Sequence, residues 1–238
     1  MKISIITATW NSAKTINATL ASLAIQTHQD YEYIVIDGGS SDNTLDVIKE
    51  SGARVDHLVS EKDKGIYDAL NKGIALATGD YVGFLHSDDF FASSLTLSNM
   101  HKLLSEKSSD AIYADLEYVD KNDTAKVIRR WQSGDYQKSK LKMGWMPPHP
   151  TFYMRRDLYQ EFGCFDLTYK IAADYDSLMR YLWVKGVKPE YLPEVTVKMR
   201  VGGASNRSLK NIIQKSREDI RVMQSVGCPC YRHFLEKI

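Results

Sequence analysis

Strand-like and helix-like segments alternate along the first 90 residues, and this order constrains the fold more than any other feature. The strand-like runs, which are rich in β-branched residues, are 2–9, 31–37, 55–60 and 80–85. Apolar residues recur at helical spacing in 11–27, 42–50 and 65–78. Strands that are apolar on both faces and alternate with helices are typical of a parallel sheet covered on both sides. We therefore expect an α/β fold with a mainly parallel central sheet and helices on both faces.

The second half of the chain is less regular. Helical patterns cover 94–105, 174–185 and 208–226, and strand patterns cover 111–118, 126–131, 151–155 and 191–199. The runs 111–118 and 126–131 flank a polar turn and predict a β-hairpin. Residues 133–145 are polar and favour no element. No repeat or linker divides the chain, so we expect one domain over residues 1–238.

The charge balance and the cysteine count exclude several classes of protein. The 238 residues carry 31 basic and 30 acidic side chains, a net charge of +1, so an overall polyanion binder is excluded and we expect no nucleic-acid partner. The three cysteines form no CxxC pair, which disfavours a structural zinc site. The longest apolar runs fall well short of the roughly 20 residues that span a bilayer. The first residues enter a strand with no signal-peptide pattern, so we expect a cytoplasmic protein.

Polar residues follow each of the four predicted strands of the first half. These segments are 7–11, 37–42, 61–65 and 86–89, and three of them contain carboxylates. Ligands bind at the carboxyl ends of strands in parallel α/β sheets. The convergence of polar ends predicts a ligand site at this edge of the sheet.

Two of these segments contain acids with competing interpretations. Asp37 fits a turn cap through an Asx-type bond, and it equally fits an acceptor for a base N–H or a ribose hydroxyl. Asp88 fits a ligand for a divalent cation that also binds diphosphate, with His86 as a second ligand. Asp89 fits the first turn of a helix, where the helix dipole favours an acid.

Three further positions in the second half are candidates. Asp174 opens a predicted helix and is either a general base or a plain N-cap. Asp176 lies about 200° around the helix from it and is expected to form an exposed pair with Arg180. His149 lies between prolines, where a surface histidine is the ordinary interpretation. The turn 202–205 fits either a phosphate cradle or a simple turn.

Several nucleotide-binding and hydrolase motifs are absent from the sequence. Residues after the first strand lack both GxxxxGK[ST] and GxGxxG, which disfavours P-loop NTPases and dinucleotide dehydrogenases. The chain also lacks a GxSxG elbow, which disfavours an α/β-hydrolase.

Taken together, the motifs resemble the inverting family-2 glycosyltransferases, whose fold is GT-A, the nucleotide-diphospho-sugar transferase fold. Residues 5–11 (IITATWN) look like the opening strand and its turn, and 34–44 (IVIDGGSSDNT) are similar to the family's DGxSxDxT stretch. Residues 63–80 resemble the next motif. The segment 86–89 (HSDD) stands where the DXD metal motif belongs, and 172–176 (AADYD) stands where the catalytic-base motif belongs.

The resemblance implies a role for each matching residue. A nucleotide-sugar donor is expected to contact Thr7, Thr9, Asp37, Asp63 and Ser87. Asp88 is expected to ligate Mn²⁺ or Mg²⁺ that bridges the diphosphate. Asp174 is the expected catalytic base, and His149 falls in the segment near the acceptor.

The chain departs from the family pattern at two acids. His86 replaces the first acid of DXD, and Ala173 replaces the acid that usually precedes the base. The QxxRW motif of processive enzymes and their membrane helices are missing, which favours the transfer of one sugar. The resemblance implies a nucleotide-binding half at about 1–90, an acceptor-binding half at about 91–206 and a helical tail at 207–238.

We therefore expect an inverting, metal-assisted transferase that moves one sugar from a nucleotide-diphospho-sugar, a UDP-sugar above all, to an acceptor hydroxyl. A saccharide or lipid-linked saccharide of surface-polysaccharide biosynthesis is the expected acceptor. A non-catalytic nucleotide-sugar-binding subunit and a nucleotidyltransferase of related fold are the alternatives. The basic tail, with Ile212, Ile213, Ile220 and Met223 on its apolar side, is expected either to dock on the domain or to touch anionic lipid at the inner membrane face. The oligomeric state is not predicted.

Overall fold

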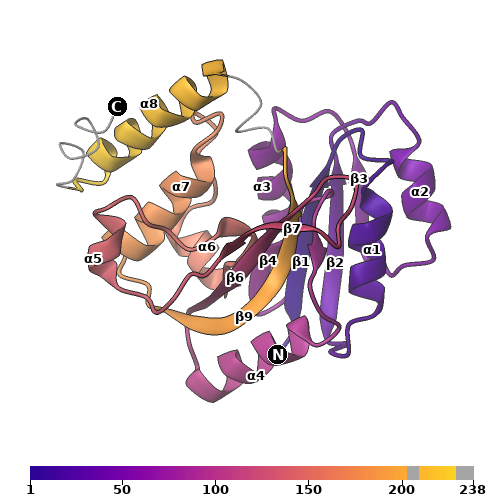
Figure 1. Cartoon of the computed structure of the whole chain (residues 1–238), viewed down its shortest axis with the longest axis horizontal. Helices are drawn as coiled ribbons and strands as arrows, with labels where there is room; N and C mark the ends of the chain where they lie inside the picture. Colours follow the sequence, from indigo (N-terminus) through magenta and orange to yellow (C-terminus); the bar gives the residue numbers. More distant parts are fainter. Residues whose placement is uncertain (203–208, 229–238) are drawn as a thin grey trace.

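A curled, mixed β-sheet runs through the centre of the molecule, with helices on both of its faces (Figure 1). The computed structural model describes residues 1–202 and 209–228. Within them the strand order is β3-β2-β1-β4-β8-β6-β9-β5, and β7 pairs with β6 outside this path.

The first half folds as the sequence predicts. Its parallel strands are β1 (Ile3–Thr9), β2 (Tyr31–Asp37), β3 (His57–Ser60) and β4 (Tyr81–Phe84). The connecting helices are α1 (Ile16–Ala24), α2 (Thr44–Glu50) and α3 (Ile66–Leu76). Every residue of β1 and β2 is buried, which explains why apolar residues dominate both strands.

The second half adds antiparallel pairs to the sheet. It comprises β5 (Phe90–Phe91), α4 (Thr96–Lys107), β6 (Ala111–Val119), β7 (Val127–Trp131), β8 (Tyr153–Arg155) and β9 (Pro189–Arg200). Strands β6 and β7 form the predicted hairpin, whereas β6 and β9 are parallel. The parallel arrangement therefore holds for the first four strands, and the second half makes the whole sheet mixed.

The remaining helical segments lie along the acceptor half and the tail. They are α5 (Lys138–Leu141), the 3-10 turn η1 (His149–Thr151), α6 (Arg156–Phe162), α7 (Ala173–Leu178), the π-helical segment η2 (Met179–Val184) and α8 (Leu209–Ser225). The helix predicted over 174–185 is thus α7 continued by η2. Neither α5 nor α6 is predicted from the sequence.

Two apolar cores lie on opposite faces of the sheet. One includes Leu70 of α3, Leu178 of α7 and Met223 of α8, and the other includes Leu20 of α1 and Met100 of α4. The predicted helical layers on both faces are therefore confirmed.

Helix α8 packs against α7, as the docked interpretation of the tail expects (Figure 1). The predicted apolar side is only partly the inward face. Met223 is buried, as are Glu218 and Asp219, whereas Ile212 and Ile213 are 46% and 53% exposed. Residues 203–208, which include most of the predicted turn at 202–205, and residues 229–238 of the tail lie outside the described residues. Among the helices of the described part, none is long and apolar enough to cross a membrane.

Candidate active site

Asn11 joins the loops that follow β1 and β2. Its side-chain oxygen accepts the main-chain N–H of Ser41 at 2.9 Å, and its own N–H donates to Ser40 Oγ at 2.8 Å. Asn11 has a positive φ of 50°, a conformation that asparagine tolerates better than most residues. The two loops therefore form one polar surface at the carboxyl edge of the sheet.

Asp37 supports the turn after β2 from inside. Its carboxylate is fully buried and accepts the N–H groups of Gly39 and Ser40 at 3.2 and 3.0 Å and the Ser60 hydroxyl at 2.7 Å. The turn-capping interpretation therefore describes what Asp37 does in the structure. Its contact with a nucleotide stays a prediction.

Asp63 lies directly against this turn. A Cβ atom added to Gly38 would stand 2.5 Å from Asp63 Oδ2, so the glycine leaves the space that the carboxylate occupies. The other oxygen, Oδ1, accepts the N–H of Gly65 at 2.8 Å. The fold thus brings Asp37 and Asp63 to one turn, as the motif pattern predicts.

The three hydroxyl residues predicted to contact the donor differ in their hydrogen-bond partners within the protein. Thr7 is buried in the sheet, where it donates to the Leu85 carbonyl at 2.5 Å and accepts from Tyr33 at 2.9 Å. Thr9 is also buried, yet its hydroxyl has no partner among the residues that the structure describes. Ser87 Oγ lies 2.9 Å from Ser12 Oγ. Thr9 is therefore the hydroxyl with unused hydrogen-bonding capacity at this edge.

His86 lies close enough to both Asp88 and Asp174 for the two carboxylates to act on its charge. Burial lowers the pKa of His86, and the carboxylates of Asp88 and Asp174 oppose that effect. The Nδ1 atom of His86 is buried without a partner within the described ranges. Residues 86 and 88 follow β4, and residue 174 is far away in sequence, so the fold brings the predicted base position close to His86.

Arg200, at the end of β9, holds the segment after β4 in place. Its guanidinium donates to the main-chain carbonyl of Asp88, and its N–H donates to Asp89 Oδ1 at 3.2 Å. Asp89 was expected in the first turn of a helix. This prediction is wrong, because strand β5 starts at the next residue, Phe90. Its carboxyl is fully buried instead, and burial together with the Asp88 charge raises its pKa well above the ordinary value.

Asp174 stands in the first turn of α7, behind its N-cap residue Ala172. Oδ1 accepts the N–H of Tyr175 at 2.8 Å and lies 3.2 Å from the Tyr67 hydroxyl of α3. Burial raises the pKa of Asp174, against the opposing effects of the Tyr175 N–H, Lys215 and Tyr67. A carboxylate with a raised pKa in a polar site is suited to general-base catalysis.

Glu218 of α8 binds the main chain just before α7. Its carboxylate accepts the N–H groups of Ile171 and Ala172, each at 2.9 Å, and that of Lys170 at 3.1 Å. N–H groups at a helix start have no partner within the helix. Helix α8 therefore anchors the segment that leads into α7, and Asp174 lies in the first turn of that helix.

Asp176 points away from Asp174, as predicted, but it is not a surface residue. It is 4% exposed and pairs with Arg180 at 2.8 Å. Arg180 also donates to the carbonyls of Phe162 and Cys164, at 2.8 and 2.6 Å. The predicted pair is present, and its predicted exposure is wrong because α6 and the following loop cover it.

His149 is buried among aromatic rings, and so the surface interpretation is wrong. Its ring stacks on Phe84 at 5.1 Å between centroids, and the His86 ring follows at 6.1 Å. Burial and the neighbouring His86 lower the pKa of His149 to about 3. His149 is therefore neutral at pH 7 and forms an aromatic wall behind His86.

Sequence reasoning missed Tyr67, Arg200 and Glu218. Tyr67 lies within the quoted motif 63–80, so its position in the motif was the available signal. Arg200 stands two residues before the turn at 202–205, at the end of a strand. Glu218 is one acid on an amphipathic helix and gives no local signal.

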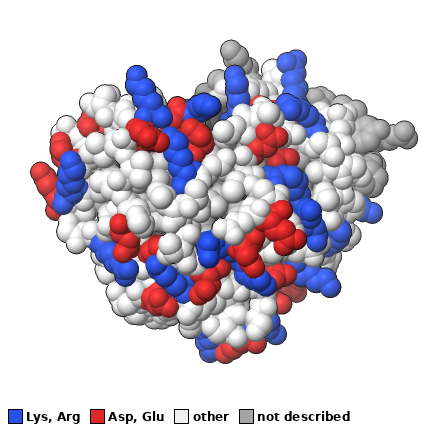
Figure 2. All heavy atoms as spheres, turned by 180° about the vertical axis from the view of Figure 1, so that it is seen from behind, with Lys and Arg blue, Asp and Glu red and all other residues white. Residues whose placement is uncertain are grey.

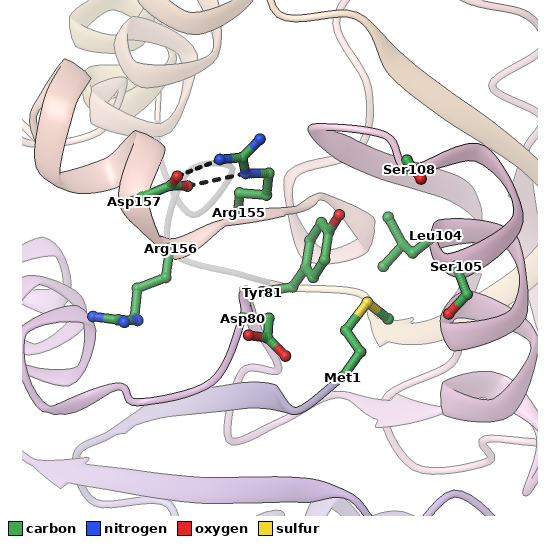
Figure 3. Close-up of a pocket in the computed structure, with 9 residues that line it drawn as sticks. All are labelled: Met1, Asp80, Tyr81, Leu104, Ser105, Ser108, Arg155, Arg156 and Asp157. Atoms are coloured by element: carbon green, nitrogen blue, oxygen red, sulfur yellow. Dashed lines mark hydrogen bonds and ion pairs between the residues drawn. The ribbon is translucent and has the colours of Figure 1, made fainter.

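A hollow of about 610 Å³ lies at the opposite end of the sheet and is not this site (Figure 3). Asp80, at the start of β4, Tyr81 and Met1 line it, together with Arg155 and Asp157, which pair with each other. None of the predicted site residues lines it. We therefore assign the candidate site to the carboxyl edge of β1, β2 and β4.

A family comparison decides the class of the protein. The family described as "Glycosyl transferase family 2" matches residues 4–168. The chain belongs to this family. The predicted family membership and the GT-A fold are thereby confirmed, and the matched range contains both the donor edge and the HSDD segment.

Curated relatives agree with this assignment. A "PGL/p-HBAD biosynthesis glycosyltransferase" of Mycobacterium bovis is 31% identical over 230 residues, covering 92% of this chain and 87% of the relative. An uncharacterized glycosyltransferase of Mycobacterium tuberculosis is 30% identical over 186 residues, 75% of this chain and 68% of the relative. The protein is therefore a glycosyltransferase.

Solved structures show the same fold. S. aureus TarS 1–349 in complex with UDP-GlcNAc superposes with a TM-score of 0.75 at 21% identity, over 95% of this chain and 65% of that chain. The mannosyltransferase PcManGT of Pyrobaculum calidifontis, in complex with GDP-Man and Mn²⁺, gives 0.67 at 17% identity, over 97% and 68%. This chain spans only 39% of the longer TarS chain.

Proposed function

We propose that the chain transfers one sugar from a UDP-sugar to an acceptor hydroxyl with inversion at the anomeric carbon. The observation that carries this proposal is that His86, after β4, lies near the carboxylates of both Asp88 and Asp174, while Asp37 and Asp63 meet at the turn after β2. The donor-binding half is residues 1–90 and the acceptor-binding half residues 91–206. TarS and its UDP-GlcNAc complex support the choice of UDP.

Asp174 acts as the general base in this proposal. It takes the proton from the acceptor hydroxyl while the acceptor oxygen forms a bond to the anomeric carbon. The bond from that carbon to the diphosphate oxygen breaks, and the nucleoside diphosphate leaves with the electron pair. A single displacement of this kind inverts the anomeric configuration. Tyr67 and Glu218 keep the Asp174 carboxylate in position.

The donor set after β4 fits a divalent cation. Asp88 offers a carboxylate, and the buried Nδ1 of His86 has no partner within the described ranges. Mn²⁺ or Mg²⁺ is commonly held by one or two protein ligands with diphosphate oxygens completing the shell. A cation held there by Asp88 and His86 would supply charge stabilisation for the leaving diphosphate.

We propose a saccharide or a lipid-linked saccharide as the acceptor. The name of the Mycobacterium bovis relative places that protein in PGL/p-HBAD biosynthesis, which supports an acceptor of cell-surface type. The buried rings of His149 and Phe84 stack behind His86 and support it from inside the domain.

Thermal shift with nucleotide diphosphates and Mn²⁺ tests the donor. At 100 times Kd the binding term is about 2.7 kcal/mol, which is a rise of roughly 5–10 °C for a domain of this size. Thr9→Val and Asp88→Asn should each shrink the rise caused by UDP. A chain that responds to no nucleotide diphosphate would refute the proposal.

The anomeric configuration of the product tests whether the transfer proceeds with inversion. NMR coupling at the anomeric proton of the transferred sugar should report the configuration opposite to that of the donor. A product that retains the donor configuration contradicts the single displacement.

A further inference from the structure

We infer that the edge of the acceptor half formed by α5 and η2 is a docking surface for an anionic membrane. The basic-aromatic edge consists of Lys138, Lys140, Lys142, Trp145, Trp183 and Lys185. This inference deepens the proposed function, because it places the enzyme where a lipid-linked acceptor lies.

Lysines and tryptophans are interleaved on this edge. Lys138 and Lys142 lie over the Trp183 ring, with Nζ 5.0 and 5.5 Å from its centroid. Lys140 lies 5.6 Å above Trp145 in the same way. α5 packs against η2, so residues more than 40 positions apart form one continuous surface. Tryptophans beside lysines are typical of protein surfaces at the lipid headgroup level.

Exposed apolar side chains stand among these charges. Met143, directly after the α5 lysines, is 75% exposed, and Val184 is 54% exposed between Trp183 and Lys185. A purely solvated basic surface needs neither of them. Basic residues combined with exposed apolar groups favour the interface of an anionic bilayer, since one set meets the headgroups and the other enters the acyl boundary.

Positive charge dominates this edge. Asp135 and Glu190 line a hollow of about 430 Å³ beside Lys138 and Lys188, and they offset part of the charge. The four lysines of the basic-aromatic edge together with Lys188 still outnumber these two acids. Figure 2 shows several Lys and Arg side chains along the right of the molecule in that view, with Asp and Glu side chains beside them.

The edge is also connected to the site. Trp145 packs edge-to-face on Tyr113 at 6.0 Å, and four residues later His149 stacks on Phe84 behind His86. A bilayer against the basic-aromatic edge therefore lies on the acceptor side, away from the donor turn at Asp37.

Vesicle co-sedimentation of the whole chain tests the inference. We expect binding to vesicles of phosphatidylcholine with phosphatidylglycerol, weaker binding at high salt, and little binding to phosphatidylcholine alone. Replacing Lys138, Lys140 and Lys142 together by Gln should lower the partition coefficient roughly 100-fold, at about fivefold for each lysine. Replacing the exposed Lys102, Lys107 and Lys121 by Gln is the matched control and should change it little.

Two further variants separate the alternatives. Met143→Ser should weaken vesicle binding severalfold but should not change the dependence of binding on salt, because it removes only an apolar contact. Ile212→Ser with Ile213→Ser tests the exposed apolar residues of α8 and should have no effect. The inference is overturned by absent binding to anionic vesicles at low salt, by undiminished binding of the triple Gln variant, or by loss of binding only in the α8 variant. Since no sugar transfer is measured, this result stands apart from the test of the proposed donor.

Discussion

The Glu218 carboxylate on α8 accepts the main-chain N–H of Ala172 at 2.9 Å, two residues before Asp174. It accepts the N–H groups of Lys170 and Ile171 as well, so three consecutive donors converge on one side chain. Burial by itself would raise the pKa of Glu218, but Gln214 and these N–H groups lower it. Glu218 therefore remains a carboxylate at neutral pH, and the tail helix positions the proposed base.

Glu218→Ala should lower kcat strongly while the affinity for UDP stays unchanged. The reason is that the loop before Asp174 loses its anchor while the donor turn remains intact, and displacement of a catalytic group by about 1 Å can cost 10²-fold in rate. Glu218→Gln keeps a carbonyl acceptor and should recover part of the rate. Gln214→Ala, which spares the main-chain contacts, is the control. If UDP affinity and kcat fall equally, Glu218 stabilises the fold as a whole and does not specifically position Asp174.

Asp176→Asn should destabilise the fold more than the loss of an exposed ion pair would. Asp176 is buried, and its partner Arg180 is itself tied to the carbonyls around residue 163. Weakening a buried charged hydrogen bond costs roughly 1–3 kcal/mol, which corresponds to a fall in Tm of several degrees at roughly 2–4 °C per kcal/mol. Differential scanning calorimetry at pH 7 measures it. A change of less than about 1 °C would restore the surface interpretation of Asp176.

The parallel part of the fold was predictable because its pattern is local. β1 and β2 are buried on both faces, so apolar residues dominate them, and polar residues stand where these strands end. The same pattern predicts that Asp37, Asp63 and Asp88 lie at one edge of the sheet. The antiparallel pairs of β8 and β5 were not predictable in this way, since strands of three and two residues carry no periodicity.

Burial in the second half depends on elements that are distant in sequence. His149 is buried because Phe84 and Phe165 enclose its ring, and Asp176 is buried because the segment around Phe162 covers it. Glu218 lies 46 residues beyond Ala172 in the chain. A single sequence shows spacing within an element and does not show which side chain of one element meets another.

Glu32 should make stability depend on acid pH. Burial alone would raise its pKa, but Lys2, Ser4 and Thr78 bond to the carboxylate and lower the pKa to about 2 from an ordinary 4.5. A lowered folded-state pKa adds stability above the unfolded value, and that stability is lost as pH falls from 4.5 toward 2. Urea unfolding of Glu32→Gln across this range should show a shallower loss than the wild type. Parallel curves for both proteins would mean that Glu32 contributes no such linkage.

Asp174→Asn should lower the transfer rate by about 10²–10⁴ and leave UDP binding intact. The amide keeps the size of the side chain but cannot take the acceptor proton. Asp46→Asn makes the same change in the first turn of α2 and is the matched control, with an expected rate near that of the wild type. A near-normal rate for Asp174→Asn contradicts the assignment of the base.

The pH profile gives an independent readout of the same carboxylate. The base must be deprotonated to work, and burial raises the pKa of Asp174, so kcat should rise with pH along a limb displaced above that of an ordinary aspartate. Lys215 lowers this pKa, and its side chain also pairs with Asp219 at 2.6 Å. Lys215→Met removes a positive charge near Asp174 and should move the acid limb to higher pH. Arg217→Met, an exposed change on the same helix, should leave it in place. If both variants share the wild-type profile, Asp174 is not the group that titrates in catalysis.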